Sequence, residues 1–245
     1  MEIDVMEALS RHLPILSEGC IEKLRESTVL VVGVGGLGSV VATYLSRAGV
    51  GKLILVDEGI VEPSNLNRQI LYGARDVGKP KALVAKERIE ELAPWCRVEA
   101  FAERFSAEKH RELVRSADIV VDALDNWRSR RELNRVCLEE AKPLVHGGVE
   151  KWYGQVTTII PCTTPCIDCF APHKEVPGGV PVLPQIAGVV GLIQSLEVVK
   201  LLCGWGTPLI GKMLVIDLAR SEFDVVKISR NPSCPTCSRL CPSRE

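Results

Sequence analysis

The first half of the chain alternates short apolar segments with segments in which apolar residues recur every three or four positions. Residues 28–32, "TVLVV", are a β-branched apolar run that ends at glycines, which indicates a buried strand. From Leu37 the apolar positions follow helical spacing, and Gly49 stands where a C-terminal glycine ends a helix. A second strand, "KLILVD" at 52–57, completes a βαβ unit and predicts a parallel sheet.

This alternation continues to about residue 145 and then changes character. Further helices are expected near 79–92, after Ser106 and over 129–141, and further strands at 97–105, 118–124 and 143–149. Three later segments alternate like antiparallel strands, at 154–161, 212–218 and 223–228. Between them, a Pro/Gly/Cys-rich stretch at 161–185 predicts a crossover loop, and the apolar segment 186–203 predicts a central buried helix.

A glycine-rich loop, "GVGGLG", separates the first strand from the first helix. Its glycines allow a tight turn, close approach of a phosphate and close packing of helix on strand, and they are Gly33, Gly35, Gly36 and Gly38. Asp57 ends the next strand, where a Rossmann fold has the carboxylate that binds a ribose. In this context the loop predicts a nucleotide site rather than a purely structural turn. The predicted fold class is α/β: a Rossmann-like doubly wound sheet, parallel in its N-terminal part and continued by antiparallel strands.

Three charged residues favour ATP over NAD and FAD as the bound nucleotide. Arg68 and Lys81 suit a triphosphate, whose γ end carries charge that a dinucleotide lacks. Asp125 follows a strand at the carboxyl edge of the sheet, where a carboxylate can hold Mg²⁺ on the phosphates. Each residue alone is equally explained as a solvated charge or a helix cap, and the combination with the glycine loop favours ATP.

Two Cys-x-x-Cys pairs predict a metal site: Cys166 with Cys169, and Cys234 with Cys237. Each pair can direct two thiolates at one ion, and together they complete a tetrahedral Cys₄ site for structural Zn²⁺. Redox activity is disfavoured because neither pair begins a helix in a thioredoxin-like βαβ unit. The remaining cysteines are expected to be small core residues or free thiols: Cys20, Cys96, Cys137, Cys162, Cys203 and Cys241.

Composition narrows the classes of partner. The chain is 46% hydrophobic and 25% charged, as in ordinary globular proteins. A formal net charge of −1 and an aromatic content of 4% argue against a nucleic-acid-binding surface. The acidic N-terminus is unlike a signal peptide, and apolar runs such as "IAGVVGLI" are too short to cross a bilayer. A cytoplasmic protein without a membrane segment is expected.

Taken together, these motifs make the chain resemble the ThiF/MoeB/HesA group of activating enzymes, relatives of the adenylation domain of ubiquitin-activating enzymes. The resemblance runs from Arg11 to Cys237 and is greatest to molybdopterin-synthase adenylyltransferases; it rests on "VVGVGGLGS", "LVDEGIVEPSNLNRQ", "VGKPKA", "DALDN", "CIDC" and "CPTC". It implies ATP- and Mg²⁺-dependent adenylation of the C-terminal glycine of a Gly-Gly-ended, ubiquitin-like sulfur-carrier protein. Molybdopterin, thiamine and tRNA-thiolation pathways all use such carriers.

The resemblance also implies an organisation and a set of residue roles. It implies one domain over 1–245, with a helical arm at 1–27, a nucleotide-binding part at 28–150, and antiparallel strands, crossover loop and zinc site at 151–245. Gly36 is expected to contact the phosphates and Asp57 the ribose, while Asp125 binds Mg²⁺. The other expected nucleotide ligands are Asn65, Arg68, Gln69, Lys81 and Asn126. Members are homodimers in which an N-terminal arginine enters the partner's site, and Arg11 in "SRHLPIL" is the candidate.

One departure from the family bears on the reaction. Many members carry a cysteine in the crossover loop that bonds covalently to the carrier, whereas this chain has none between Cys169 and Cys203 and has Pro177 at about that position. We therefore expect an enzyme that stops at the acyl-adenylate. Two alternatives remain: a tRNA-base dehydratase with the same adenylating site, and a non-catalytic partner subunit. An NAD dehydrogenase is least favoured, because no catalytic His or Tyr-x-x-x-Lys set accompanies the loop.

Overall fold

One mixed sheet of eight strands runs through the protein. The computed structural model describes residues 4–172 and 181–241. The strand order is β3-β2-β1-β4-β5-β6-β7-β8. The first five strands pair in parallel: β1 (Thr28–Val32), β2 (Lys52–Val56), β3 (Arg97–Phe101), β4 (Ile119–Asp122) and β5 (Leu144–Glu150). The last three continue antiparallel: β6 (Tyr153–Ile159), β7 (Lys212–Asp217) and β8 (Glu222–Lys227). The expected fold class is confirmed.

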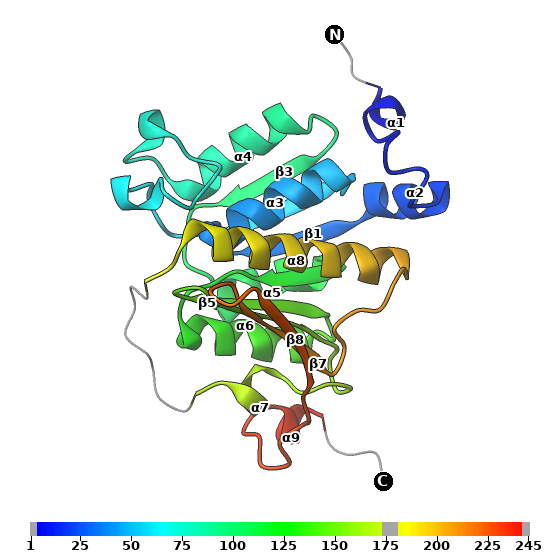
Figure 1. Cartoon of the computed structure of the whole chain (residues 1–245), viewed down its shortest axis with the longest axis vertical. Helices are drawn as coiled ribbons and strands as arrows, with labels where there is room; N and C mark the ends of the chain where they lie inside the picture. The colour runs from blue at the N-terminus through cyan, green and yellow to red at the C-terminus, as the bar shows by residue number, and fades with distance from the viewer. Residues whose placement is uncertain (1–3, 173–180, 242–245) are drawn as a thin grey trace.

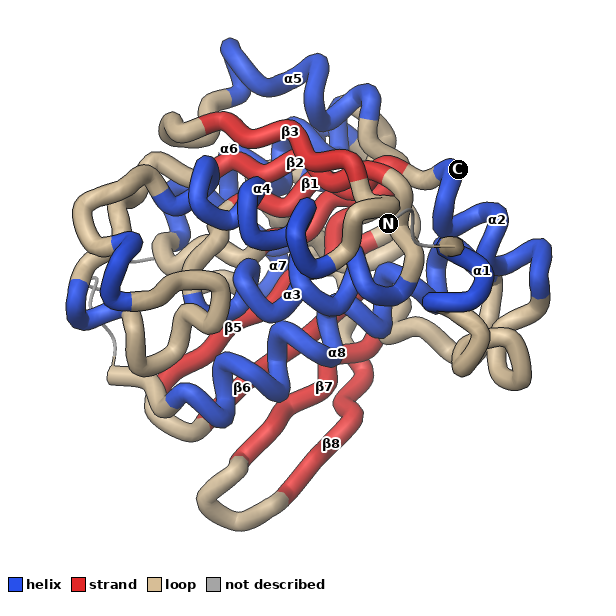
Figure 2. Tube along the Cα trace, turned by 90° about the horizontal axis from the view of Figure 1, so that it is seen from above, coloured by secondary structure: helices blue, strands red, loops and turns tan. Residues whose placement is uncertain are grey.

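Helices cover both faces of this sheet (Figures 1 and 2). One face carries α2 (Glu18–Glu26), α3 (Gly36–Ala48), α4 (Lys81–Leu92) and α8 (Pro184–Cys203). The other carries α5 (Ala107–Ser116) and α6 (Trp127–Glu139). Shorter helical segments are α1 (Val5–Ala8), η1 (Pro63–Asn65), η2 (Ala74–Asp76), α7 (Ile167–Phe170) and α9 (Cys237–Leu240).

The apolar run of β1 follows from this two-sided cover. Val29 and Val31 pack on the α3 side, whereas Leu30 and Val32 pack on the α6 side. Successive side chains of a strand point to opposite faces, so a strand buried on both faces is apolar throughout. Gly49 ends α3 in the left-handed conformation, at φ 106°, as its position predicted.

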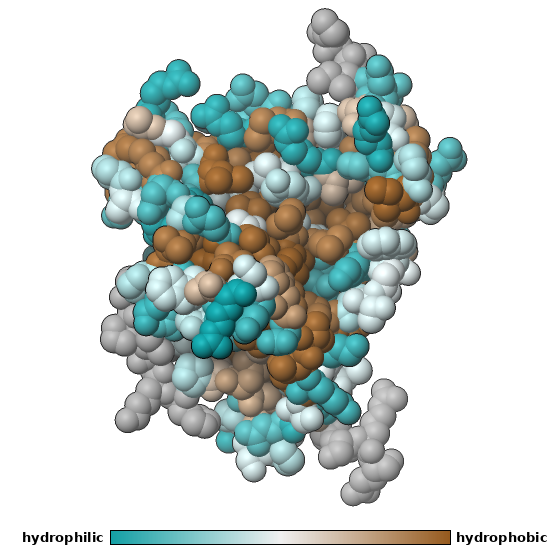
Figure 3. All heavy atoms as spheres, viewed as in Figure 1, coloured by the Kyte–Doolittle hydropathy of each residue, from teal (hydrophilic) through white to brown (hydrophobic). Residues whose placement is uncertain are grey.

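The apolar helix α8 lies on one face of the sheet rather than at its centre. It packs against α3, β5 and β6, yet Leu192 and Leu196 remain 43% and 42% exposed. Figure 3 shows apolar surface across the middle of this face. Contrary to the sequence expectation, this one described helix is long and apolar enough to span a bilayer, by length and composition alone. Because 56% of its span is buried inside the protein, it serves here as a core helix.

Four of the cysteines expected to be core residues or free thiols form disulfides, although two of them, Cys20 and Cys241, are buried as a core residue would be. Cys20 in α2 is bonded to Cys203 at the end of α8, and Cys162 is bonded to Cys241. The bonded cysteines are 183 and 79 residues apart in the sequence, so no local spacing of cysteines predicts these disulfides. Cys96 and Cys137 are buried free thiols, as expected.

The stretch 161–185 contains more regular structure than the crossover loop expected there. It includes α7, and α8 already begins at Pro184. Pro177, at the position expected for a family cysteine, lies outside the described residues. At the far edge of the sheet β7 and β8 form a hairpin that projects from the body, and all of β8 is exposed (Figure 2).

Candidate functional site

A cavity of about 320 Å³ opens at the carboxyl ends of β1, β2 and β4. This edge is where open α/β sheets bind ligands. Its lining brings together most of the residues that the sequence singled out: Gly33, Gly35, Gly36, Asp57, Arg68, Gln69, Lys81, Asp125 and Asn126. They come from the loops after three separate strands and from the start of α4.

The glycine loop forms one wall of the cavity. Gly33 has φ +89°, and a β-carbon there would lie 2.6 Å from the carbonyl oxygen of Ala123. A β-carbon on Gly38 would lie 1.9 Å from the carbonyl oxygen of Gly33, so Gly38 packs α3 on the loop behind the cavity. Gly35 caps α3 without a hydrogen bond from any described side chain. The free N–H groups of the first turn of α3 therefore suit an anion.

Buried side chains hold this loop through Val34. The N–H of Val34 donates to Asp57 Oδ2 at 2.6 Å, and its carbonyl accepts from the hydroxyl of Tyr72 at 2.7 Å. Burial, with a smaller contribution from the charge of Asp57, raises the pKa of Tyr72 above its ordinary value, so the phenol stays a donor. Asp57 Oδ1 also accepts from the N–H of Gly59 at 2.7 Å. Asp57 thus ties the loops after β1 and β2 together.

Two cations and one amide face the cavity from the segment 68–81. Arg68 Nη1 donates to the carbonyl of Ser64 at 2.8 Å and to Asn67 Oδ1 at 2.9 Å. No acidic side chain in the described ranges forms an ion pair with Arg68 or Lys81, so their charge is available to a ligand. Gln69 is 4% exposed, and its Oε1 has no hydrogen-bond partner within residues 4–172 and 181–241. An orphaned buried oxygen in a cavity wall fits a bound polar group.

Asp125 and Asn126 are the candidates for the N-cap of α6 and for a cation ligand at the cavity. Asn126 is the N-cap of α6, because its Oδ1 accepts from the N–H of Ser129 at 2.9 Å. Asp125 is exposed at the cavity and accepts a bond from Asn126 Nδ2 at 3.3 Å. The alternative of Asp125 as a helix cap is thereby removed, and its carboxylate remains open to a cation.

Besides Gly38, two predicted site residues stand apart from the cavity. Asn65 is buried, where its Oδ1 accepts from the N–H of Glu62 at 3.1 Å and its Nδ2 donates to Ser64 Oγ at 3.4 Å. Arg11 is exposed in the segment before α2, which precedes β1 and so lies at the end of the sheet opposite the cavity (Figure 1). Their predicted ligand roles remain predictions.

The cavity also contains residues that sequence reasoning missed: Glu58, Arg104, Phe105, Ser129 and Arg130. The segment 97–105 was expected to be one strand, but β3 ends at Phe101. Arg104 and Phe105 therefore follow the strand at its carboxyl edge, where the same rule that found Asp125 would have found them. Arg130 gave no signal, because an arginine within a helix is usually solvated.

The four cysteines of the two pairs meet beneath α6. Their Sγ atoms all lie within 4.8 Å of one another, with 3.5 Å between Cys166 and Cys234 and 3.5 Å between Cys169 and Cys237. A zinc ion with four Zn–S bonds of about 2.3 Å places its sulfurs about 3.8 Å apart, so the thiols fit such an ion. The fold therefore joins pairs that are far apart in the sequence.

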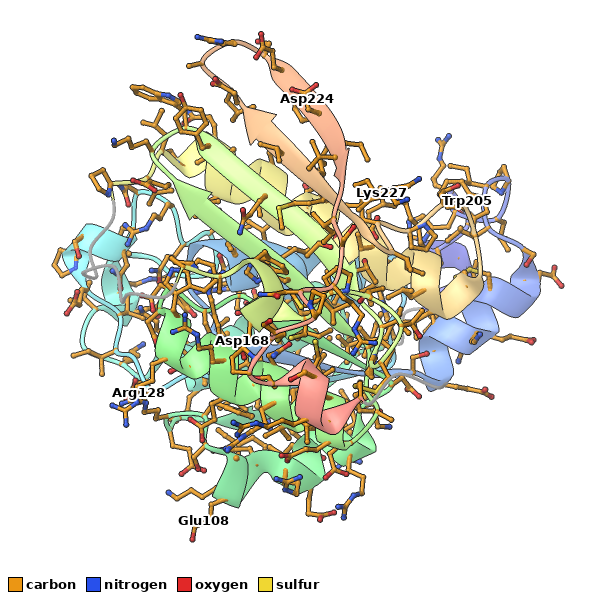
Figure 4. The ribbon with its side chains drawn as sticks, turned by 90° about the horizontal axis from the view of Figure 1, so that it is seen from below. Glu108, Arg128, Asp168, Trp205, Asp224 and Lys227 are labelled. Atoms are coloured by element: carbon orange, nitrogen blue, oxygen red, sulfur yellow. A yellow bond between two sulfur atoms is a disulfide. The ribbon has the colours of Figure 1, made fainter. Side chains whose placement is uncertain are left out.

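Asp168 connects this cluster to the rest of the protein. Its Oδ1 accepts from Arg131 Nε of α6 at 3.0 Å, and its Oδ2 accepts from the hydroxyl of Thr236 in the second pair. Figure 4 shows Asp168 between α6 and the segment that carries α9. In addition, Asn134 Oδ1 accepts from the N–H of Ile167 at 3.1 Å. These contacts anchor both pairs on α6, which begins at the cavity.

A doubly wound sheet with a glycine loop and an acid after β2 defines a nucleotide-binding protein of the Rossmann type. The ThiF family profile matches residues 9–236. The chain belongs to the ThiF family.

Relatives of known activity match over most of their length. The sulfur carrier protein adenylyltransferase of Thermus thermophilus is 41% identical over 235 residues, covering 91% of this chain and 87% of the relative. The SAMP-activating enzyme E1 of Haloferax volcanii is 42% identical over 241 residues, covering 95% and 88%. Among solved structures, E. coli MccB with AMPCPP and MccA has a TM-score of 0.83 at 24% identity, covering 94% of this chain and 74% of MccB. That last likeness supports the fold alone.

Proposed function

We propose that the protein is an ATP-dependent adenylyltransferase that activates the C-terminal glycine of a ubiquitin-like sulfur-carrier protein. The observation that carries the proposal is the cavity, in which a glycine loop, two cations without an ion pair among the described residues, and an exposed carboxylate converge at one edge of the sheet. Membership of the ThiF family, with a sulfur carrier protein adenylyltransferase at 41% identity, supports the same activity. The products are a carrier acyl-adenylate and pyrophosphate.

The residues around the cavity suit this chemistry because they neutralise and align anions. The carrier carboxylate attacks the α-phosphorus of ATP, and both reactants are negatively charged. Arg68 and Lys81 offset that repulsion, and the first turn of α3 cradles phosphate oxygens. The attacking carboxylate is already ionised near neutral pH, so no general base is needed.

Two metal ions complete the proposed enzyme. Mg²⁺ supplies charge neutralisation on the phosphates, and Asp125 is its protein ligand. Cys166, Cys169, Cys234 and Cys237 would hold Zn²⁺, and their four thiolates would leave no open coordination position. The zinc is therefore structural, and we place its role in joining the C-terminal segment to α6.

The enzyme is proposed to act as a homodimer, with Arg11 entering the partner's site. Arg11 is exposed and lies away from the cavity of its own chain, so only a second copy can bring it to a nucleotide. The uncovered side of α8, with Leu192 and Leu196 exposed, supplies apolar surface for such an association. We further propose one adenylation domain over 1–245, cytoplasmic, that forms no covalent cysteine intermediate with the carrier.

ATP–pyrophosphate exchange with each Gly-Gly-ended carrier of the same cell tests the activity. Exchange with one carrier, abolished by Lys81→Ala, is the expected result. Tight ATP binding without exchange for any carrier would favour the tRNA-base dehydratase or the non-catalytic subunit instead. Trapping a covalent carrier–enzyme adduct that a thiol reductant cleaves would contradict the proposal that no cysteine intermediate forms.

A further inference from the structure

A charged cluster is buried beneath the cavity floor. Asp122 ends β4, His146 lies in β5, and both are 0% exposed, while Arg130 of α6 is 6% exposed. His146 Nδ1 lies 2.7 Å from Asp122 Oδ2, and Arg130 Nη1 lies 3.8 Å from the same oxygen. Burying charges costs several kcal/mol per ion, roughly, before pairing offsets it, so an apolar core would serve stability as well. The cluster therefore calls for a role other than stability.

The cluster forms hydrogen bonds with both backbone groups of Leu124, a residue of the cavity wall. Asp122 Oδ1 accepts from the N–H of Leu124 at 3.0 Å, and Arg130 Nη2 donates to the carbonyl of Leu124. Leu124 directly precedes Asp125. Holding both backbone groups of Leu124 fixes the direction in which the chain enters Asp125, and with it the position of that carboxylate.

The hydrogen bonds of the cluster leave little freedom to rearrange. Burial, reinforced by Arg130, lowers the pKa of His146 despite the neighbouring Asp122, so the ring is neutral. Its Nδ1–H then donates to Asp122, and its Nε2 accepts from Gln155 Nε2 at 3.2 Å. The guanidinium of Arg130 lies 5.1 Å from the ring centre of Trp127. Fully satisfied buried networks of this kind are rigid.

We propose that Asp122, His146 and Arg130 are positioning residues that preorganise Asp125 for the metal–nucleotide complex. The inference rests on the proposed function only in taking Asp125 as the ligand of the nucleotide-bound cation. The glycine loop is held by a separate set, Asp57 and Tyr72. Loosening the buried cluster should therefore weaken the coupling between metal and ATP and leave metal-free ATP binding unchanged.

Equilibrium binding of ATP to the full chain, without divalent cation and with Mn²⁺, measures that coupling directly. His146 does not line the cavity, which makes it the cleaner position to change. His146→Leu removes the donor to Asp122, whereas His146→Asn keeps an N–H at a similar place. The coupling is the ATP Kd without metal divided by the ATP Kd with Mn²⁺. We expect this ratio to fall about tenfold in His146→Leu, toward its value in Asp125→Ala, and to return to the wild-type value in His146→Asn.

Thr158→Val is the matched control, because the Thr158 hydroxyl donates to Glu197 Oε2 at 2.7 Å in a buried pair away from the cavity. It should lower thermal stability and keep the coupling. The proposal fails if His146→Leu retains the wild-type ratio, including the case in which its ATP Kd without metal rises by the same factor as its ATP Kd with Mn²⁺. If His146→Leu does not fold, Asp122→Asn gives the same decision, because it replaces the carboxylate oxygen that lies near both His146 and Arg130 and, like His146, Asp122 does not line the cavity. Wild type that binds ATP with no metal effect would instead refute Asp125 as a metal ligand.

Discussion

Replacing Asp57 by alanine should weaken ATP binding while the protein stays folded. The carboxylate accepts from the N–H groups of Val34 at 2.6 Å and Gly59 at 2.7 Å. Hydrogen bonds to a charged group contribute about 1.5–3 kcal/mol each, but Asp57 is half-buried and water can replace part of that. The net loss in unfolding free energy should be about 1–3 kcal/mol, or about 2–12 °C in Tm for a chain of this size.

The expected effect on the nucleotide is larger than the effect on stability. Loss of a charge-assisted bond to a ribose hydroxyl should raise the ATP Kd by about 10- to 150-fold. Isothermal titration calorimetry with ATP, 2′-deoxy-ATP and 3′-deoxy-ATP gives a double-mutant cycle. Wild type should bind at least one deoxy analogue more weakly than ATP, and Asp57→Ala should bind that analogue and ATP alike.

Asp76→Ala is the matched control for this experiment. Asp76 is buried outside the cavity and accepts from the N–H of Gly73 at 2.9 Å, a bond that, with a salt bridge to Lys79, lowers its pKa. Its loss should reduce stability and leave ATP affinity unchanged. If Asp57→Ala binds ATP as wild type does, or if the deoxy analogue loses the same factor in both proteins, the carboxylate does not hold the ribose.

Four other outcomes follow from the same structure. Asp125→Ala should abolish ATP–pyrophosphate exchange and leave zinc content by atomic absorption unchanged; full activity would remove Asp125 from the mechanism. Chelating the zinc, or Cys166→Ser, should lower Tm and loosen the C-terminal segment to proteolysis; an unchanged Tm would contradict a structural metal. Cys20→Ser should lower the unfolding free energy by up to about 5 kcal/mol, because the disulfide closes a 183-residue loop, and a thiol reductant should reproduce this loss in wild type. The pKa of His146 is lowered in the folded chain, so below about pH 6.5 the unfolded chain takes up a proton that the folded chain excludes. The unfolding free energy from denaturant titrations should therefore decrease as the pH is lowered through this range, and should decrease less in His146→Asn.

Much of the fold could be predicted because local patterns and the layering rules agree. The β-branched run of β1, the spacing along α3 and the glycine at 49 each fix one element, and right-handed crossovers then dictate a parallel sheet. Boundaries moved where one residue decides them: α4 begins at Lys81 because Pro80 stands at its N-cap. The exposed side of α8 escaped prediction, because composition alone does not say which side of an apolar helix a sheet covers.

The candidate site divides in the same way. Residues placed by the carboxyl-edge rule, such as Asp57 and Asp125, meet at the cavity as the sequence led us to expect. Asn65 does not line it, because its amide instead caps η1 through Glu62. The Asp122–His146–Arg130 cluster had no sequence signature, since its members come from three elements that only the sheet brings together. The disulfides were missed for the same reason.

Mass spectrometry of the carrier after incubation with enzyme, ATP and Mg²⁺ tests the central claim most directly. The account predicts a carrier heavier by one adenylate at its C-terminal glycine, with pyrophosphate released in equal amount and no adduct that a thiol reductant cleaves. A carrier without its last glycine should remain unmodified. Unmodified intact carrier, from every candidate and with ATP demonstrably bound, would contradict the account.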